Sequence, residues 1–146
     1  MKKITCLIVV FVLFVGLCLF SSCTVNKKTN YIFEGSFVCE KDGVVYYLEI
    51  KEINEESYSE RDGFNVVHDV VNNNKYYELS FYWMIESQKE TYNFINLKDS
   101  HPKTNGLPVF YVDDNNNKFI PQNIKAPNKY TVVLNGVYLE LEDYKS

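Results

Sequence analysis

Apolar and polar residues alternate along most of the chain beyond its first thirty positions, and a period of two is typical of a β-strand with one buried face. In the segment 75–87 the odd positions from Tyr77 to Ile85 are all apolar or aromatic. In the segment 137–143 apolar residues alternate with Tyr138 and two glutamates. One-sided alternation of this kind predicts an antiparallel sheet with one face on a core and the other in water.

Turn signals divide this pattern into short segments. Asp42-Gly43 and Asn135-Gly136 favour tight hairpins, because asparagine, aspartate and glycine tolerate a positive φ. Asparagine-rich runs at 72–74 and 113–117 predict longer polar turns. We therefore expect strands at residues 31–39, 44–53, 64–71, 75–87, 90–97, 108–112, 117–124, 129–134 and 137–143. The segment 99–107 is expected to be a loop, with room for a short helix there or near residues 54–59.

These strands predict an all-β fold, an antiparallel meander that forms a small barrel or sandwich of about 8–9 strands. The composition agrees, because the chain has 12 Tyr and 10 Phe but one Ala and one Arg. Aromatic residues favour strands, whereas alanine and arginine favour helices. Gly35-Ser36-Phe37 followed by meandering strands loosely resembles a lipocalin-type barrel, and that resemblance implies a carrier of a small apolar ligand.

The N-terminal segment has a different pattern. Residues 1–3 form a basic start, residues 4–20 are almost wholly apolar, and Ser21 and Ser22 precede Cys23. A basic start, an apolar run and small residues are the three parts of a secretory signal. The run is 17 residues long. That length lies between the roughly 7–15 residues of a signal core and the roughly 20 of a membrane span, so it permits a cleaved signal or an apolar anchor helix.

The stretch Leu19-Phe20-Ser21-Ser22-Cys23 resembles a bacterial lipobox. In that family the signal is cleaved just before the cysteine, and a diacylglycerol is attached to its thiol. The two serines are the small residues that the family has there, whereas Phe20 stands where the family usually has leucine. The resemblance implies a lipoprotein on the extracytoplasmic face of the cell membrane, lipidated at Cys23. The alternatives are an anchor helix and a signal cleaved at another position.

The lipoprotein interpretation divides the chain into three parts: a signal peptide at 1–22, the lipidated cysteine and a tether at 23–30, and a single β domain at 31–146. Cleavage removes Lys2 and Lys3 and leaves 13 basic against 19 acidic residues, so the formal net charge changes from −4 to −6. Nucleic-acid binding needs a basic face. We therefore expect contact with the membrane through the lipid and no nucleic-acid partner.

The four cysteines do not form a disulfide framework under this interpretation. Cys6 and Cys18 leave with the signal, and Cys23 carries lipid through its sulfur. Cys39 is then the only free thiol, and an intrachain disulfide is not expected. Phe33, Gly35 and Phe37 share the strand parity of Cys39, which predicts a small, inward-facing, buried thiol.

Candidate catalytic and metal-binding residues are few. His68-Asp69 could be half of a catalytic pair, but no nucleophile motif accompanies it, and His101 stands in no metal-spaced cluster. The run 113–117 is rich in oxygen ligands but lacks the spacing, the central glycine and the closing glutamate of a calcium loop. Glu55-Glu56 is expected to be solvated. We therefore expect no enzyme, no cofactor and no metal.

Three tyrosines, Tyr47, Tyr82 and Tyr138, fall on the polar-face parity of their strands. Exposed tyrosine offers contact area and a hydroxyl at low entropic cost, so these residues could form a recognition surface. Half-buried packing across strands is the alternative. The expected function is a membrane-anchored lipoprotein whose β domain binds a protein or small-molecule partner. A lipocalin-like carrier and a structural or accessory envelope protein are the alternatives.

We expect Cys23→Ser to abolish incorporation of labelled lipid and to leave an uncut precursor, because the thiol is the predicted site of acylation. Metabolic labelling and gel mobility measure the two effects, and Cys39→Ser is the matched control that should behave as wild type. Normal labelling and processing of the Cys23 variant would show that the lipobox interpretation is wrong.

Overall fold

The structure is a computed structural model, and it describes residues 31–60, 65–69, 73–94, 97, 103–104, 107–121 and 128–144. The predicted signal peptide, Cys23 and the tether therefore lie outside the described residues, and so does His101. Within the described ranges, no helix combines the length and apolar character needed to cross a membrane.

Strands make up almost all of the regular structure in the described part of the chain, with one short helix, α2 (Glu55–Glu60). The strands are β1 (Gly35–Lys41), β2 (Val44–Ile53), β3 (Val66–Asp69), β4 (Lys75–Ile85), β5 (Gln88–Tyr92), β6 (Lys103–Thr104), β7 (Leu107–Pro108), β8 (Phe110–Tyr111), β9 (Lys118–Ile120), β10 (Lys129–Leu134) and β11 (Val137–Asp143).

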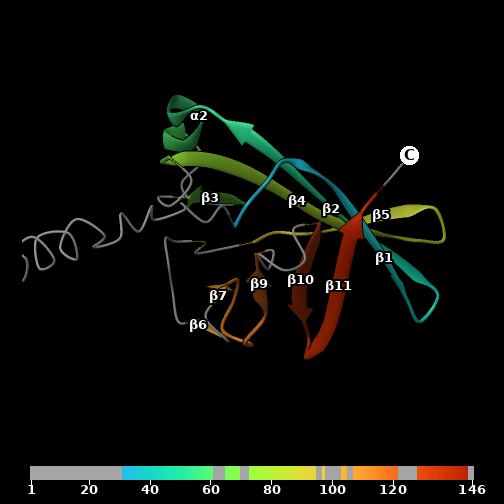
Figure 1. The fold of residues 1–146 in the computed structure, drawn as a ribbon. Coiled ribbons are helices and arrows are strands. Elements are labelled where there is room, and N and C mark those ends of the chain that lie inside the picture. Colours follow the sequence, from blue (N-terminus) through green and yellow to red (C-terminus); the bar gives the residue numbers. More distant parts are fainter. Residues whose placement is uncertain are drawn as a thin grey trace, which may run out of the picture.

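Nine of these strands form one antiparallel sheet in the order β3-β4-β2-β1-β11-β10-β9-β8, with β5 also paired to β4. Strands β6 and β7 form a separate pair. The sheet curls into a half-barrel, with β1 to β5 in one wall and β8 to β11 in the other (Figure 1). The predicted all-β antiparallel class is confirmed. The described strands of the two outer edges do not pair with each other.

Strands β3 and β5 lie end to end along the same edge of β4, and Asn65 joins them. Its backbone N–H donates to the Phe94 carbonyl at 3.0 Å, and its carbonyl accepts from the Leu79 N–H at 2.7 Å. Its side-chain oxygen accepts from the Phe94 N–H at 2.6 Å. Asn65 has φ 55°, which asparagine tolerates better than most residues. The strand predicted at 64–71 therefore begins only at Val66.

The interior of the half-barrel is filled by side chains from both walls. Leu48, Leu79, Leu139 and Leu141 are among the fully buried residues. A continuous series of ring contacts crosses between the walls, and its centroid distances are Phe81–Phe94 5.7 Å, Phe94–Phe119 6.0 Å, Phe119–Tyr130 5.7 Å and Tyr130–Phe37 4.5 Å. These distances are typical of favourable aromatic pairs. The aromatic excess of the sequence therefore supplies the core.

The predicted boundary between the segments 75–87 and 90–97 is wrong. Strand β4 ends at Ile85, and Glu86 and Ser87 form the turn to β5, which begins at Gln88. Both turn residues have positive φ, 47° and 69°. A turn of this kind usually contains glycine or asparagine, so the sequence carries no signal for it.

The predicted strand start at residue 31 is also wrong, because residues 31–34 lie outside the sheet. Tyr130 holds this segment instead. Its hydroxyl accepts from the Phe33 N–H at 2.8 Å and donates to the Phe33 carbonyl at 3.3 Å. Ile32 is 1% exposed, whereas the Phe33 side chain points outward and is 40% exposed. The inward orientation predicted for Phe33 is therefore wrong.

The other predictions differ in accuracy. The ranges predicted for β2, β10 and β11 match the structure to the residue. The segment 99–107, predicted as a loop, contains β6 and the first residue of β7. Among the described residues of the strands predicted at 108–112 and 117–124, the regular parts are Pro108 of β7, β8 and β9. A helix near residues 54–59 is confirmed as α2, whose first turn is capped by Asn54 through a 2.8 Å bond from the Ser57 N–H.

We expect Leu139→Ala to lower the free energy of unfolding by about 2–5 kcal/mol, because it opens a cavity in the core. Tyr138→Ala, at the neighbouring position on the outer face, should change it by only about 0.5 kcal/mol. Urea unfolding of the two variants measures the difference. Equal losses would mean that strand β11 does not alternate between core and solvent.

Candidate functional site

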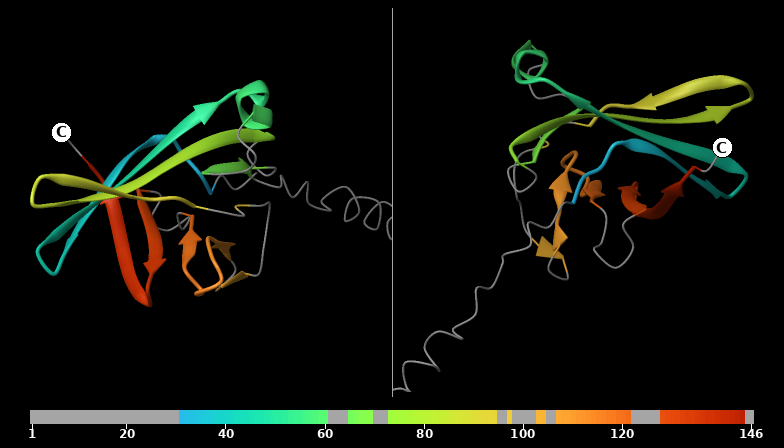
Figure 2. Two further views of the ribbon diagram at one scale, coloured as in Figure 1. Left: turned by 180° about the vertical axis from the view of Figure 1, so that it is seen from behind. Right: turned by 45° about the horizontal axis from the view of Figure 1, so that its top comes forward.

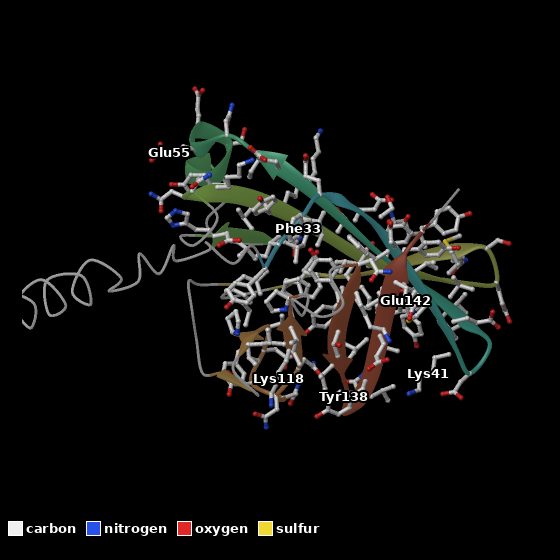
Figure 3. The ribbon with its side chains drawn as sticks, viewed as in Figure 1. Phe33, Lys41, Glu55, Lys118, Tyr138 and Glu142 are labelled. Atoms are coloured by element: carbon white, nitrogen blue, oxygen red, sulfur yellow. The ribbon has the colours of Figure 1, made fainter. Side chains whose placement is uncertain are left out.

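Two long hairpins, β1–β2 and β4–β5, extend beyond the rest of the half-barrel at one end (Figure 1). They lie side by side because β2 pairs with β4 from Tyr46↔Trp83 to Ile53↔Tyr76. The β10–β11 turn lies near the β1–β2 turn, and Lys41 Nζ donates to the Tyr138 carbonyl at 3.2 Å (Figure 3). The structure thus gathers several hairpin turns at one end of the domain.

Most of the exposed large apolar side chains among the described residues lie in or beside hairpin turns. The described chain exposes seven such residues, and five of them lie in or beside the β4–β5, β8–β9 and β10–β11 turns: Met84, Ile85, Tyr111, Val137 and Tyr138. Tyr138 is 61% exposed and Ile85 is 48% exposed. Single exposed apolar residues are ordinary on a protein surface, whereas a concentration of them marks a candidate interaction site.

The inner faces of the two long hairpins carry a continuous cross-strand row. Cys39 in β1 is the partner of Tyr46 in β2, Tyr46 is the partner of Trp83 in β4, and Trp83 is the partner of Glu90 in β5. Cys39, Tyr46 and Trp83 are partly buried and pack against the core. Glu90 is exposed. This row is the outermost layer of the interior, where the core meets solvent.

The outer face of the same strands carries the predicted tyrosine pair. Tyr47 and Tyr82 stack at 5.0 Å between centroids with an interplanar angle of 14°. The Tyr82 hydroxyl donates to Glu49 at 2.9 Å, and Lys89 Nζ lies 3.8 Å from the Tyr82 ring centroid. Burial and the hydrogen bond to Glu49 raise the pKa of Tyr82 to about 12. This pair therefore has its partners within the domain, which favours cross-strand packing, whereas Tyr138 is open to solvent.

The oxygen-rich segment 113–117 forms the β8–β9 turn, and its hydrogen bonds link that turn to the end of β5 and to the β10–β11 turn. Tyr92 at the end of β5 donates its hydroxyl to Asp113 at 2.6 Å, and the Asn117 amide donates to the same carboxylate at 2.5 Å. Asn117 is 1% exposed, and its oxygen accepts from the Asn135 N–H at 2.6 Å. Within the described ranges, no group of three His, Cys, Asp or Glu side chains could hold a metal ion.

Burial by itself would raise the pKa of the Asp113 carboxyl, but the hydrogen bonds that it accepts outweigh this effect. Bonds from the Tyr92 hydroxyl, the Asn117 amide and two backbone N–H groups lower its pKa below the usual 3.8. The charged carboxylate is thus stabilised by the fold. The network joins β5 to the β8–β9 turn, across the gap between the sheet edges.

The structure separates His68 from Asp69, which the sequence placed together as half of a catalytic pair. Consecutive strand residues point to opposite faces. The His68 ring stacks on Tyr76 at 4.4 Å, and Asp69 is buried. Cys39 is half-buried in the inner-face row, where burial raises the pKa of its thiol and Lys41 partly opposes the shift. The thiol therefore remains protonated at neutral pH.

Sequence parity predicted Trp83 and Ile85 to be core residues together with Leu79 and Phe81. The structure instead places Trp83 at the boundary and leaves Ile85 48% exposed, because β4 continues past the end of the core. One signal for this was available, since Trp83-Met84-Ile85 breaks the alternation with three consecutive apolar residues.

Searches among protein-family models, curated proteins and solved structures returned no match to this chain.

The Asp113 network gives a prediction for the pH dependence of stability. Because the folded state lowers the pKa of Asp113, its contribution is complete above the ordinary pKa and is lost as the pH falls through and below 3.8. We expect Asp113→Asn to reduce the loss of unfolding free energy between about pH 5 and pH 2. The exposed neighbour substitution Asp114→Asn is the control. Parallel pH profiles for wild type and Asp113→Asn would contradict the network.

Proposed function

We propose that the chain is a bacterial lipoprotein, held on the extracytoplasmic face of the cell membrane by lipid on Cys23, whose β domain binds a protein partner. The observation that carries the binding part is the concentration of exposed apolar side chains at the hairpin turns, where Met84 and Ile85 are 40% and 48% exposed. Protein interfaces are enriched in methionine and aromatic residues at such positions. The anchoring part rests on the lipobox-like sequence that ends at Cys23.

The position of the first described residues supports an anchor and a binding surface at different places on the domain. The described ribbon begins at Tyr31, well away from the β1–β2 and β4–β5 turns (Figure 2). Tyr130 fixes the adjoining Phe33 backbone to the domain. An eleven-residue strand such as β4 spans about 35 Å, and a seven-residue tether reaches at most about 25 Å. A domain anchored through Cys23 would therefore be attached to its tether at a part of the fold well away from these turns.

The filled interior supports a surface binder over a lipocalin-like carrier. A carrier needs an apolar cavity of several hundred Å³. Here Phe94 and Phe119 meet at 6.0 Å between centroids in the middle of the half-barrel, and Phe119 contacts Tyr130 at 5.7 Å. Rings from opposite walls thus occupy the space where a carrier would hold its ligand. A protein bound at the hairpin turns needs no such space.

A photo-crosslinking residue at Ile85 tests the proposal in cells that express the full chain. The same residue at Glu56, exposed in helix α2, is the matched control. We expect an adduct of defined mass from position 85 that is absent from position 56. No adduct from position 85, or the same adducts from both positions, would contradict a binding surface at the turns and favour the accessory envelope protein.

A further inference from the structure

The inner-face row at the hairpin turns contains two aromatic rings set at an angle to each other. The Tyr46 and Trp83 centroids are 5.8 Å apart, and their planes are tilted by 47°. The buried Phe81 contacts both rings, stacked on Tyr46 at 6.1 Å and tilted to Trp83 at 5.9 Å. Tyr46, Trp83 and Phe81 therefore form a cluster of three mutually contacting rings. Tyr46 and Trp83 are only partly buried, so part of their surface remains open to solvent.

The polar groups around this pair have few partners among the described residues. Within the described part of the chain, neither the indole N–H of Trp83 nor the hydroxyl of Tyr46 makes a hydrogen bond. Across the strand from Trp83 stands Glu90, which is exposed and has no ion-pair partner among the described residues. Lys41, which shares the parity of Cys39 in the adjoining row, already donates to the Tyr138 carbonyl.

The rings of Tyr46 and Trp83, the Glu90 carboxylate and the overall charge of the chain all contribute negative potential at this position. The faces of the tyrosine and tryptophan rings are negative because of the π quadrupole, and tryptophan is the strongest cation–π partner among the side chains. The Glu90 carboxylate adds a full charge at the edge of the pair. The acidic balance of the chain, 19 acidic against 15 basic residues, adds a long-range field of the same sign. The occupant that fits this chemistry is a cation.

We propose that Tyr46, Trp83 and Glu90 bind a lysine or arginine side chain of a basic polypeptide. This inference rests on the proposed function and names the chemistry of the partner. A polypeptide fits better than a free cation, because the exposed Ile85, which shares the face of Trp83 in β4, would contact the apolar stem and backbone around the charged group. We name this set of three residues the cation cluster.

Trp83 is the only tryptophan of the chain, so its intrinsic fluorescence reports on the cation cluster alone. The test uses the full chain in non-ionic detergent, titrated with decalysine and with a neutral decapeptide of glycine and serine. We expect a saturable change of emission with decalysine that weakens as salt is added, and no change with the neutral peptide. No saturable change with decalysine would overturn the proposal, and so would saturation by tetramethylammonium alone.

Matched variants separate the cation cluster from general charge effects. Glu90→Gln should weaken decalysine binding about two- to fivefold, whereas Glu86→Gln in the turn of the same hairpin removes the same charge and should leave it unchanged. Tyr46→Leu should weaken binding about two- to thirtyfold, and Tyr46→Phe, which keeps the ring, should retain it. Equal losses in the two glutamate variants, or equal binding by the leucine and phenylalanine variants, would overturn the proposal.

The two experiments fail in distinguishable ways. A crosslinked partner at position 85 without any response of Trp83 to decalysine would leave the proposed function intact and reject the cation cluster. A titration that responds as expected, with no adduct at position 85, would retain a cation site and reject a protein-binding role at the turns.

Discussion

The contact between Phe94 and Phe119, with ring centroids 6.0 Å apart, is the interaction on which the rest of the structure depends. Backbone hydrogen bonds join each strand to its neighbours, but the described strands at the two edges of the sheet do not pair. An open sheet of this size needs another force to hold its walls together. The aromatic rings supply it by burying apolar area from both walls in one continuous series. The hydrogen bond from Tyr92 to Asp113 spans the same gap closer to solvent.

This way of closing the fold determines what remains available for binding. Because rings fill the interior, the recognition that we propose is placed at the end of the core, where β4 and β5 continue into solvent beyond the last buried layer. Tyr46 and Trp83 belong to both regions, since each packs on Phe81 on one side and is partly open on the other. The geometry of the proposed cation cluster is therefore set by the same aromatic packing that closes the half-barrel. Substitutions deep in the core should disturb it indirectly.

Much of this fold can be predicted from the sequence, because apolar and polar residues alternate visibly in a strand that has one buried face. Strands β2, β10 and β11 follow from alternation and from turn dipeptides that contain glycine. The Glu86-Ser87 turn does not, because two residues without a turn signal adopt positive φ there. The Asn65 junction does not either, because hydrogen bonds with Leu79 and Phe94, which are distant in sequence, hold its unusual φ in place. The candidate site was harder to predict from the sequence than the fold was. Parity assigned Trp83 to the core, whereas the structure shows that β4 continues past the end of the core. The lipidation site, by contrast, depends on a local motif that ends at Cys23, and it remains a prediction from sequence.

A double-mutant cycle between Phe94 and Phe119 tests the central claim most directly. The free energies of unfolding of Phe94→Leu, Phe119→Leu and the double variant are compared with that of wild type. Rings in contact across the gap predict a coupling energy of about 0.5–1.5 kcal/mol. Losses that add to within about 0.3 kcal/mol would mean that the two walls are not held together by this contact, and the account of the half-barrel would be contradicted.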